Sequence, residues 1–114
     1  MTEAELLAQR QLDAYNKRDI DAFAECYAED IELCDLLTGN TFCSSREQLI
    51  ARYGPMFANR PNLHCTLVRR IVCGNFAYDE EHVVGLVENT VVHAVATYYV
   101  KDNLIHKAWF VRAE

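Results

Sequence analysis

The chain has 114 residues, and its 11 Lys and Arg against 17 Asp and Glu give a formal net charge of −6. This length predicts one domain, residues 1–114, and the 51% share of hydrophobic residues is enough for one core. The acidic balance and the lack of a basic cluster argue against nucleic acid or an anionic membrane surface as a partner. No apolar run approaches the roughly 20 residues of a membrane-spanning helix.

The five cysteines show no metal-binding or disulfide pattern, because their number is odd and no Cys-x-x-Cys spacing occurs. They are Cys26, Cys34, Cys43, Cys65 and Cys73. We predict that they are buried small side chains in a reducing compartment. The acidic N-terminal segment also lacks the apolar stretch of a secretory signal. The sequence therefore predicts a cytoplasmic protein.

Capping residues and a change of hydrophobic period define the first predicted elements. The capping box Thr2-x-x-Glu5 begins a helix expected over residues 2–16, and Asp19 caps a second, shorter helix. From Ile31 onward, apolar residues alternate along the chain, which predicts a strand.

A second capping box, Ser44-x-x-Glu47, predicts a third helix after a turn at residues 36–40 and a short extended segment at 41–43. Gly54-Pro55 is expected to interrupt this helix, because proline lacks the amide donor and clashes with the preceding turn.

Two hairpins are predicted in the rest of the chain. A two-residue turn at 74–75 gives the first hairpin a register that places Arg70 opposite Asp79 and Arg69 opposite Glu80. Both of these cross-strand pairs carry opposite charges, which supports the register.

The second hairpin turns at Asp102-Asn103, two residues that tolerate positive φ. Its expected register places Tyr99 opposite His106 and Ala96 opposite Trp109. Helices followed by a run of antiparallel strands predict an α+β fold.

Several strings along this order of elements carry a family resemblance. They are AYNKRDIDAF at 14–23, YAEDIE at 27–32, residues 46–53, PNLH at 61–64, RIVCGNF at 70–76 and residues 105–111. Together they resemble the nuclear transport factor 2-like superfamily and, within it, the SnoaL-like and steroid isomerase-like proteins. The resemblance implies a cone-shaped α+β barrel, also called cystatin-like, in which a strongly curved antiparallel sheet wraps around N-terminal helices and leaves an apolar pocket. It also implies a homodimer formed through the outer sheet face.

Asp35 is the candidate general base. It continues the side of the predicted strand that carries Ile31 and Leu33, so its carboxylate is expected to face the apolar interior. Burial there would raise its pKa toward the range of a general base. The resemblance agrees, because Asp35 falls at the position of the proton-transferring Asp of the ketosteroid isomerases. The alternative is that Asp35 caps the turn at 36–40, a common role for Asp.

Gln11 and Tyr15 are the candidate polar anchors of the pocket. By the resemblance, the oxyanion-binding Tyr of the isomerases falls at Gln11, and their protonated Asp falls near Ala96 or Thr97. Neither position supplies the strong acid of that chemistry, so true steroid isomerisation is not expected. Gln11 keeps an amide donor. Tyr15, one helical turn further on, either points its hydroxyl into the same space or belongs to the core.

The predicted pocket wall consists of aromatic residues and two histidines. They are Tyr27, Tyr53, Phe57, His82, Tyr98, His106 and Trp109. The aromatic residues fit an ordinary core equally well, and each histidine fits either a proton shuttle or an exposed position. Because no His-x-x-x-His spacing occurs, no catalytic metal is predicted.

The charged residues of the first hairpin are predicted to form cross-strand ion pairs rather than a catalytic cluster. They are Arg69, Arg70, Asp79, Glu80 and Glu81. The alternative is that one of these carboxylates faces the interior of the fold, and the resemblance points to Glu81 as that residue.

Two functions follow. The first is a protein that binds a small apolar molecule, as a cofactor-free isomerase or lyase acting on a cyclic or carbonyl substrate with Asp35 as general base; a cyclase, dehydratase or hydrolase also fits. The second is a noncatalytic dimeric module whose pocket is filled by its own aromatic residues. The apolar segment from Val91 to Val100 motivates the second, because both of its faces need cover.

Overall fold

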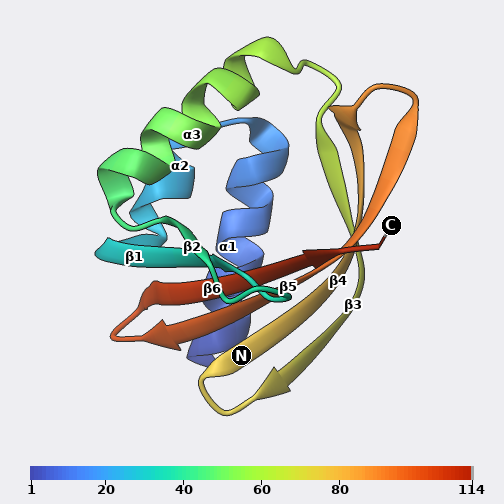
Figure 1. Cartoon of the computed structure of the whole chain (residues 1–114). Helices are drawn as coiled ribbons and strands as arrows, with labels where there is room; N and C mark the ends of the chain where they lie inside the picture. The colour runs from blue at the N-terminus through green and yellow to red at the C-terminus, as the bar shows by residue number, and fades with distance from the viewer. Residues whose placement is uncertain (114) are drawn as a thin grey trace.

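The computed structural model describes residues 1–113, in which three helices pack on one face of a curved sheet (Figure 1). In chain order the elements are α1 (Glu3–Lys17), α2 (Ile20–Glu25), β1 (Tyr27–Asp35), β2 (Thr41–Cys43), α3 (Arg46–Asn59), β3 (His64–Cys73), β4 (Phe76–Val87), β5 (Thr90–Lys101) and β6 (Leu104–Arg112). The six strands form one sheet in the order β2-β1-β6-β5-β4-β3. Only the pairing of β1 with β6 is parallel. The predicted α+β class is confirmed.

The first two helices begin where the sequence predicts. The hydroxyl of Thr2 accepts a hydrogen bond from the amide of Glu5, and the carboxylate of Asp19 accepts one from the amide of Ala22, each at 3.1 Å. Such caps satisfy amide donors that have no partner within the first turn of a helix. Among the described residues, no helix is long and apolar enough to cross a membrane.

The third helix differs from the prediction at its start and in its middle. Its N-cap is Ser45 rather than Ser44, and the Ser45 hydroxyl accepts from the amide of Gln48 at 3.1 Å. The helix also continues through Pro55 instead of being interrupted there. Pro55 and Ala51, which lies four residues earlier, are both exposed. The carbonyl that loses its partner to proline is therefore open to water.

Strand β1 begins at Tyr27, four residues before its predicted start at Ile31. The three residues after Tyr27 are buried, exposed and exposed, so this segment lacks the alternation that marks a strand. Arg46 of α3 holds it by donating two hydrogen bonds to the carbonyl of Tyr27, at 2.9 and 2.6 Å. A contact from another element therefore supports the part of the strand that the local pattern does not show.

The hairpin of β3 and β4 has the predicted register, with Arg70 opposite Asp79 and Arg69 opposite Glu80. Gly74 takes a left-handed φ of 57° in the two-residue turn. A turn of this length fixes which residues pair on either side of it. The prediction is confirmed because the turn and the charge pairs agree.

The hairpin of β5 and β6 corrects the predicted register. Its two-residue turn forms as expected, with left-handed φ at both residues. The register then shifts by one residue after the turn, so that Tyr99 pairs with Lys107 rather than His106, and Trp109 pairs with Thr97. A β-bulge adds one residue to one strand, and the hydrophobic pattern does not reveal its position.

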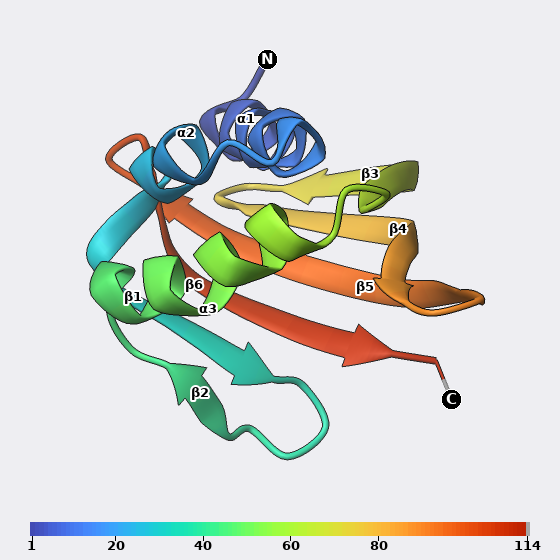
Figure 2. The ribbon, with the colours of Figure 1, turned by 90° about the horizontal axis from the view of Figure 1, so that it is seen from above.

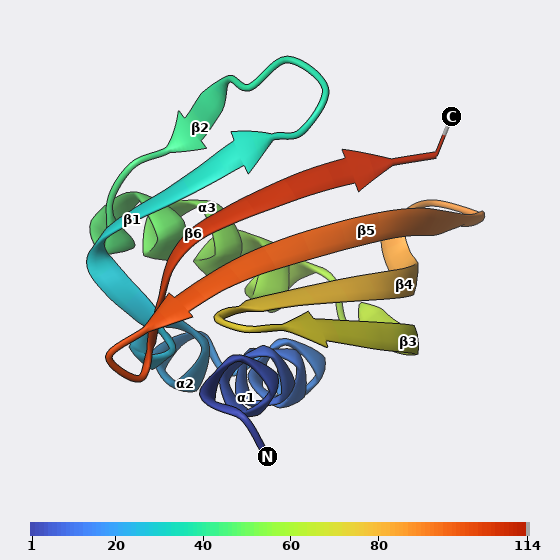
Figure 3. The same ribbon diagram turned by 90° about the horizontal axis from the view of Figure 1, so that it is seen from below.

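All three helices lie over the concave face of the sheet, and the opposite, convex face carries no helix (Figures 2 and 3). Aromatic rings fill the space where the helices meet the sheet. The ring centre of Phe23 lies 5.0 Å from those of Tyr27 and Tyr53 and 5.3 Å from that of Phe57. The core therefore lies between the helices and the concave face.

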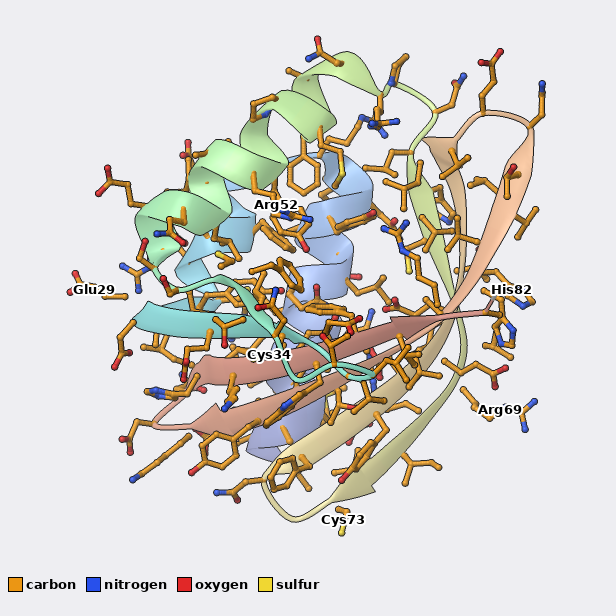
Figure 4. All side chains as sticks on the ribbon, in the orientation of Figure 1. Glu29, Cys34, Arg52, Arg69, Cys73 and His82 are labelled. Carbon is orange, nitrogen blue, oxygen red and sulfur yellow. The ribbon has the colours of Figure 1, made fainter. Side chains whose placement is uncertain are left out.

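Four cysteines are buried as predicted, but Cys73 is exposed, which corrects the expectation for that residue. Cys73 ends β3, the edge strand of the sheet, and Figure 4 shows its side chain at the tip of the β3–β4 hairpin. No neighbouring element lies beyond an edge strand to cover it.

Candidate functional site

A cavity with a volume of about 580 Å³ lies between the helices and the concave face of the sheet. All three helices and all six strands contribute residues to its wall. A volume of this size accommodates a small organic ligand. A cavity of this volume argues against the alternative of a pocket filled by its own aromatic residues.

Glu81 brings a carboxyl group into this cavity from β4. Alternation along the strand places Asp79 and Glu81 on the inner face, and Glu81 is 9% exposed. Burial, followed by the nearby charge of Asp79, raises the pKa of Glu81 to about 7, while the thiol of Cys65 and the charge of Arg70 act in the opposite direction. The Glu81 carboxyl group therefore changes its protonation state near neutral pH.

Asp79, the other inward-facing acid of β4, is held in a buried ion pair. Arg70 Nε and Nη2 donate to the two carboxylate oxygens of Asp79 at 2.6 and 2.9 Å, and Arg70 Nη1 donates to Gln9 of α1 at 3.0 Å. This two-pronged contact ties β3 and β4 to α1. Within residues 1–113, Glu81 makes no comparable ion pair.

Four tyrosines line the cavity together with Glu81. They are Tyr15 of α1, Tyr27 of β1, Tyr53 of α3 and Tyr98 of β5. Burial raises the pKa of all four phenols, that of Tyr53 to about 12, and the negative charge of Glu81 adds to the effect in each case. All four hydroxyls therefore keep their protons at neutral pH and serve as hydrogen-bond donors.

Gln11 and Tyr15, the two predicted anchors, both line the cavity. Gln11 is buried, and its amide nitrogen donates to the carbonyl of Ala8 at 3.0 Å, while its oxygen accepts from the hydroxyl of Tyr27 at 3.3 Å. Gln11 thus orients Tyr27. The ring of Tyr15 packs edge-on against Phe57 at 5.4 Å between centres, so Tyr15 contributes both to the cavity and to the core.

The structure corrects the environment predicted for Asp35. Its side chain lines the cavity, but one carboxylate oxygen accepts hydrogen bonds from the amide and the hydroxyl of Thr38, each at 2.8 Å. These hydrogen bonds lower the pKa of Asp35, whereas burial was expected to raise it. The alternative interpretation, that Asp35 caps the turn, is therefore the one the structure shows. The reason is that β1 ends at the open side of the cavity.

Only three of the predicted wall residues line the cavity, namely Tyr27, Tyr53 and Tyr98. Phe57 packs behind them in the aromatic core instead.

The other three wall predictions, His82, His106 and Trp109, are wrong, because these side chains lie on the convex face. Figure 4 shows His82 on the side of the sheet away from the helices, and its ring centre is 5.1 Å from that of His93. Trp109 and His106 lie near Phe76 and Tyr99 respectively. Strand alternation sends every second side chain outward, and the bulge in the last hairpin decides which ones in β6.

Residues that both line the cavity and are exposed mark its mouth. Arg52 of α3, Arg112 of β6 and Leu37 of the β1–β2 turn meet both conditions. The guanidinium of Arg52 lies over the ring of Phe42, 4.6 Å from its centre, and Figure 4 shows the Arg52 side chain reaching from α3 toward the sheet. Sequence reasoning missed both arginines, because nothing in the local pattern brings residues 52 and 112 together.

No group of three or more His, Cys, Asp or Glu side chains within residues 1–113 is arranged to hold a metal ion. The polar groups that line the inner part of the cavity include the four phenols, the amide of Gln11 and the carboxyl group of Glu81. This set can bind an organic molecule, polarise an oxygen atom by hydrogen bonding and exchange a proton.

Comparison with solved structures places the fold among proteins of largely unassigned activity. The chain is similar to a cystatin-fold protein from Novosphingobium aromaticivorans (TM-score 0.85, 20% identity, 98% of this chain and 99% of that one). It is also similar to a SnoaL-like protein from Burkholderia thailandensis (0.81, 18%, 98% and 95%). A third is a ketosteroid isomerase-like fold from Catenulispora acidiphila in complex with trimethylamine (0.76, 17%, 92% and 83%).

A search of curated proteins gives no significant match. The model of the SnoaL-like domain, by contrast, matches residues 8–108, which is most of the chain. The expected family resemblance is confirmed, and the chain belongs to the SnoaL-like domain family.

Proposed function

We propose that this protein takes a small, largely apolar carbonyl compound into its cavity and moves a proton on it without a cofactor, as an isomerase or lyase. The observation that carries the proposal is a buried carboxyl group, Glu81, inside an aromatic cavity of about 580 Å³ with a pKa of about 7. A general acid or base works best when its pKa lies near the working pH.

The surrounding phenols supply the second requirement of this chemistry. When ionised Glu81 removes a proton from the carbon next to a carbonyl, negative charge develops on the carbonyl oxygen of the substrate. Tyr15, Tyr53 and Tyr98 line the same cavity and donate hydrogen bonds from neutral hydroxyls. Donors aimed at a developing oxyanion in a site shielded from water stabilise it strongly. Protonated Glu81 then returns the proton to another carbon, which completes an isomerisation.

Gln11 and Asp35 have supporting roles in this proposal. Gln11 holds the hydroxyl of Tyr27 in place and so shapes the end of the cavity next to α1. Asp35 is ionised at the mouth and is the second candidate for proton transfer, since it lines the same cavity. Its carboxylate is less basic than that of Glu81, so Glu81 is the preferred base.

The test uses the neutral ketone 2-tetralone as the probe. NMR in heavy water measures how fast the protons on the carbons next to its carbonyl group are replaced by deuterium. We expect the wild-type protein to accelerate exchange and Glu81→Gln to slow the accelerated rate about 100-fold or more. Asp35→Asn is the matched variant and should keep most of the rate. Binding of 2-tetralone, followed by its NMR line broadening, should survive in Glu81→Gln. A wild-type protein that neither binds nor accelerates exchange contradicts the proposal, and an unchanged rate in Glu81→Gln contradicts the role of Glu81.

A second candidate function, association into a homodimer, is favoured by an aromatic patch on the convex face. The patch consists of Phe76, Tyr78, Tyr99 and Trp109, and the ring centre of Phe76 lies 5.3 to 6.4 Å from those of the other three. No helix covers this face. Tyr78 is exposed and the other three rings are half-buried, and apolar patches that stay accessible to solvent mark surfaces that bind another protein. Sedimentation at micromolar concentration should give a dimer that Tyr99→Glu dissociates, and a monomeric wild-type protein would contradict this candidate.

A further inference from the structure

The mouth of the cavity carries positive charge on a chain that is otherwise acidic. Arg52 and Arg112 line the cavity and are exposed, and neither forms an ion pair with another side chain in residues 1–113. Both act on the same phenol. Burial raises the pKa of Tyr53 to about 12, and the charges of Arg52 and Arg112 act in the opposite direction.

The acid that the described residues place at the mouth, Asp35, does not cancel the two arginines. Asp35 lines the same cavity, but its Oδ2 is occupied by the amide and hydroxyl of Thr38. Within residues 1–113, the three ionised side chains at the mouth therefore carry a net charge of +1, while the whole chain carries −6. An arginine that forms no ion pair within residues 1–113 is well suited to bind an anionic group on a ligand.

The interior of the cavity is, in contrast, unsuited to an anion. Its deep wall is built from apolar and aromatic side chains such as Leu12, Phe23 and Val83, and its single carboxyl group is Glu81. Moving a carboxylate of the ligand into this region would remove its hydration and bring it toward Glu81. A ligand with one apolar end and one anionic end therefore has a single favourable orientation.

We propose that the ligand of this cavity is an amphipathic carboxylate, whose apolar body lies among the aromatic rings and whose carboxylate sits at the mouth between Arg52 and Arg112. This inference rests on the proposed function, because it assumes that the cavity binds a small molecule. It adds the chemical class of that molecule and the two residues that select it.

The experiment compares three ligands of one shape and different charge. They are 2-naphthylacetate, neutral 2-naphthylacetamide and the cationic 2-(2-naphthyl)ethylamine, each titrated against the full chain at pH 7 and low salt. We expect the carboxylate to bind about tenfold more tightly than the amide, and the amine more weakly than both. Added salt should reduce the advantage of the carboxylate, because the mouth is exposed to solvent.

Variants that each remove one positive charge then show which residues recognise the carboxylate of the ligand. Arg52→Gln and Arg112→Gln should each weaken binding of the carboxylate about fivefold and leave the amide unchanged. Arg69→Gln is the matched control, because Arg69 lies on the convex face with its side chain 71% exposed, and it should change neither affinity.

The outcomes separate this inference from the proposed function. Equal affinity for carboxylate and amide, an equal loss in the Arg69→Gln control, or tighter binding of the amine would overturn the inference while leaving small-molecule binding intact. Failure of all three ligands and of 2-tetralone to bind would overturn both.

Discussion

Replacing Glu81 by glutamine should change how the stability of the protein depends on pH. In the folded chain the pKa of Glu81 is about 7, against 4.5 for an ordinary glutamate. At about 1.36 kcal/mol for each pKa unit, keeping this group ionised inside the cavity costs about 3 kcal/mol of folding free energy.

The sign follows from where the proton binds more tightly. Between pH 4.5 and pH 7 the folded state holds a proton on Glu81 that the unfolded state has released, so the stability of the wild-type protein falls as pH rises through this window. The amide side chain in the Glu81→Gln variant carries no charge at any of these pH values. The unfolding free energy of this variant relative to wild type should therefore rise by about 3 kcal/mol between pH 4.5 and pH 8.

Urea unfolding at a series of pH values, followed by circular dichroism, measures this difference directly. Glu29→Gln is the matched control, because Glu29 is an exposed glutamate on β1, pointing away from the molecule in Figure 4. Its difference from wild type should stay flat with pH. If the curve for Glu81→Gln is equally flat, the carboxyl group is not held in its neutral form and the reasoning on the candidate base is wrong.

Three further variants test other parts of the fold by urea unfolding. Arg70→Ala leaves Asp79 as an unpaired buried charge and should lower the free energy of unfolding by about 3 to 5 kcal/mol. Arg69→Ala removes an exposed pair and should lower it by less than about 1 kcal/mol. Similar losses in the two variants would contradict the buried pair. Gly85→Ala should lower the free energy of unfolding by at least about 3 kcal/mol, because φ at this residue is +75° and a Cβ would overlap the backbone of residue 62. Gly39 has a similar φ, but no atom lies near its Cβ position, so Gly39→Ala should lower the free energy of unfolding by only about 1 to 2 kcal/mol. Asp35→Asn should be less stable than wild type at pH 7, and the difference should shrink below pH 4, since the pKa of Asp35 is lowered in the folded state; a constant difference would contradict its capping role.

The local signals in the sequence were sufficient for most elements. Thr2 and Asp19 begin helices as predicted, because a capping side chain acts on amides within three residues of itself. The first hairpin has its predicted register for the same reason, since a two-residue turn fixes the pairing of the strands beside it. Pro55 shows the limit of such rules, because its exposed position removes the cost on which the predicted interruption depended.

The residues of the candidate site likewise fall into those that local sequence signals place correctly and those that they do not. Gln11 and Tyr15 lie in the cavity as predicted, since the period of one amphipathic helix places them on the same face. For Asp35 the sequence offered two interpretations, and the hydrogen bonds from Thr38 decide in favour of the turn cap. Trp109 was placed on the wrong face because a one-residue bulge is not visible in the hydrophobic pattern.

The sequence by itself determined the family, the order of helices and strands and the acidic, core-forming character of the chain, because these depend on composition and on neighbours a few residues apart. Only the tertiary structure decided that Glu81 is the buried acid of the cavity and that Arg52 and Arg112 both line its mouth. The pKa of a carboxyl group depends on burial and on charges brought close by folding. Residues 52 and 112 come from a helix and a strand that only the closed fold places around one opening.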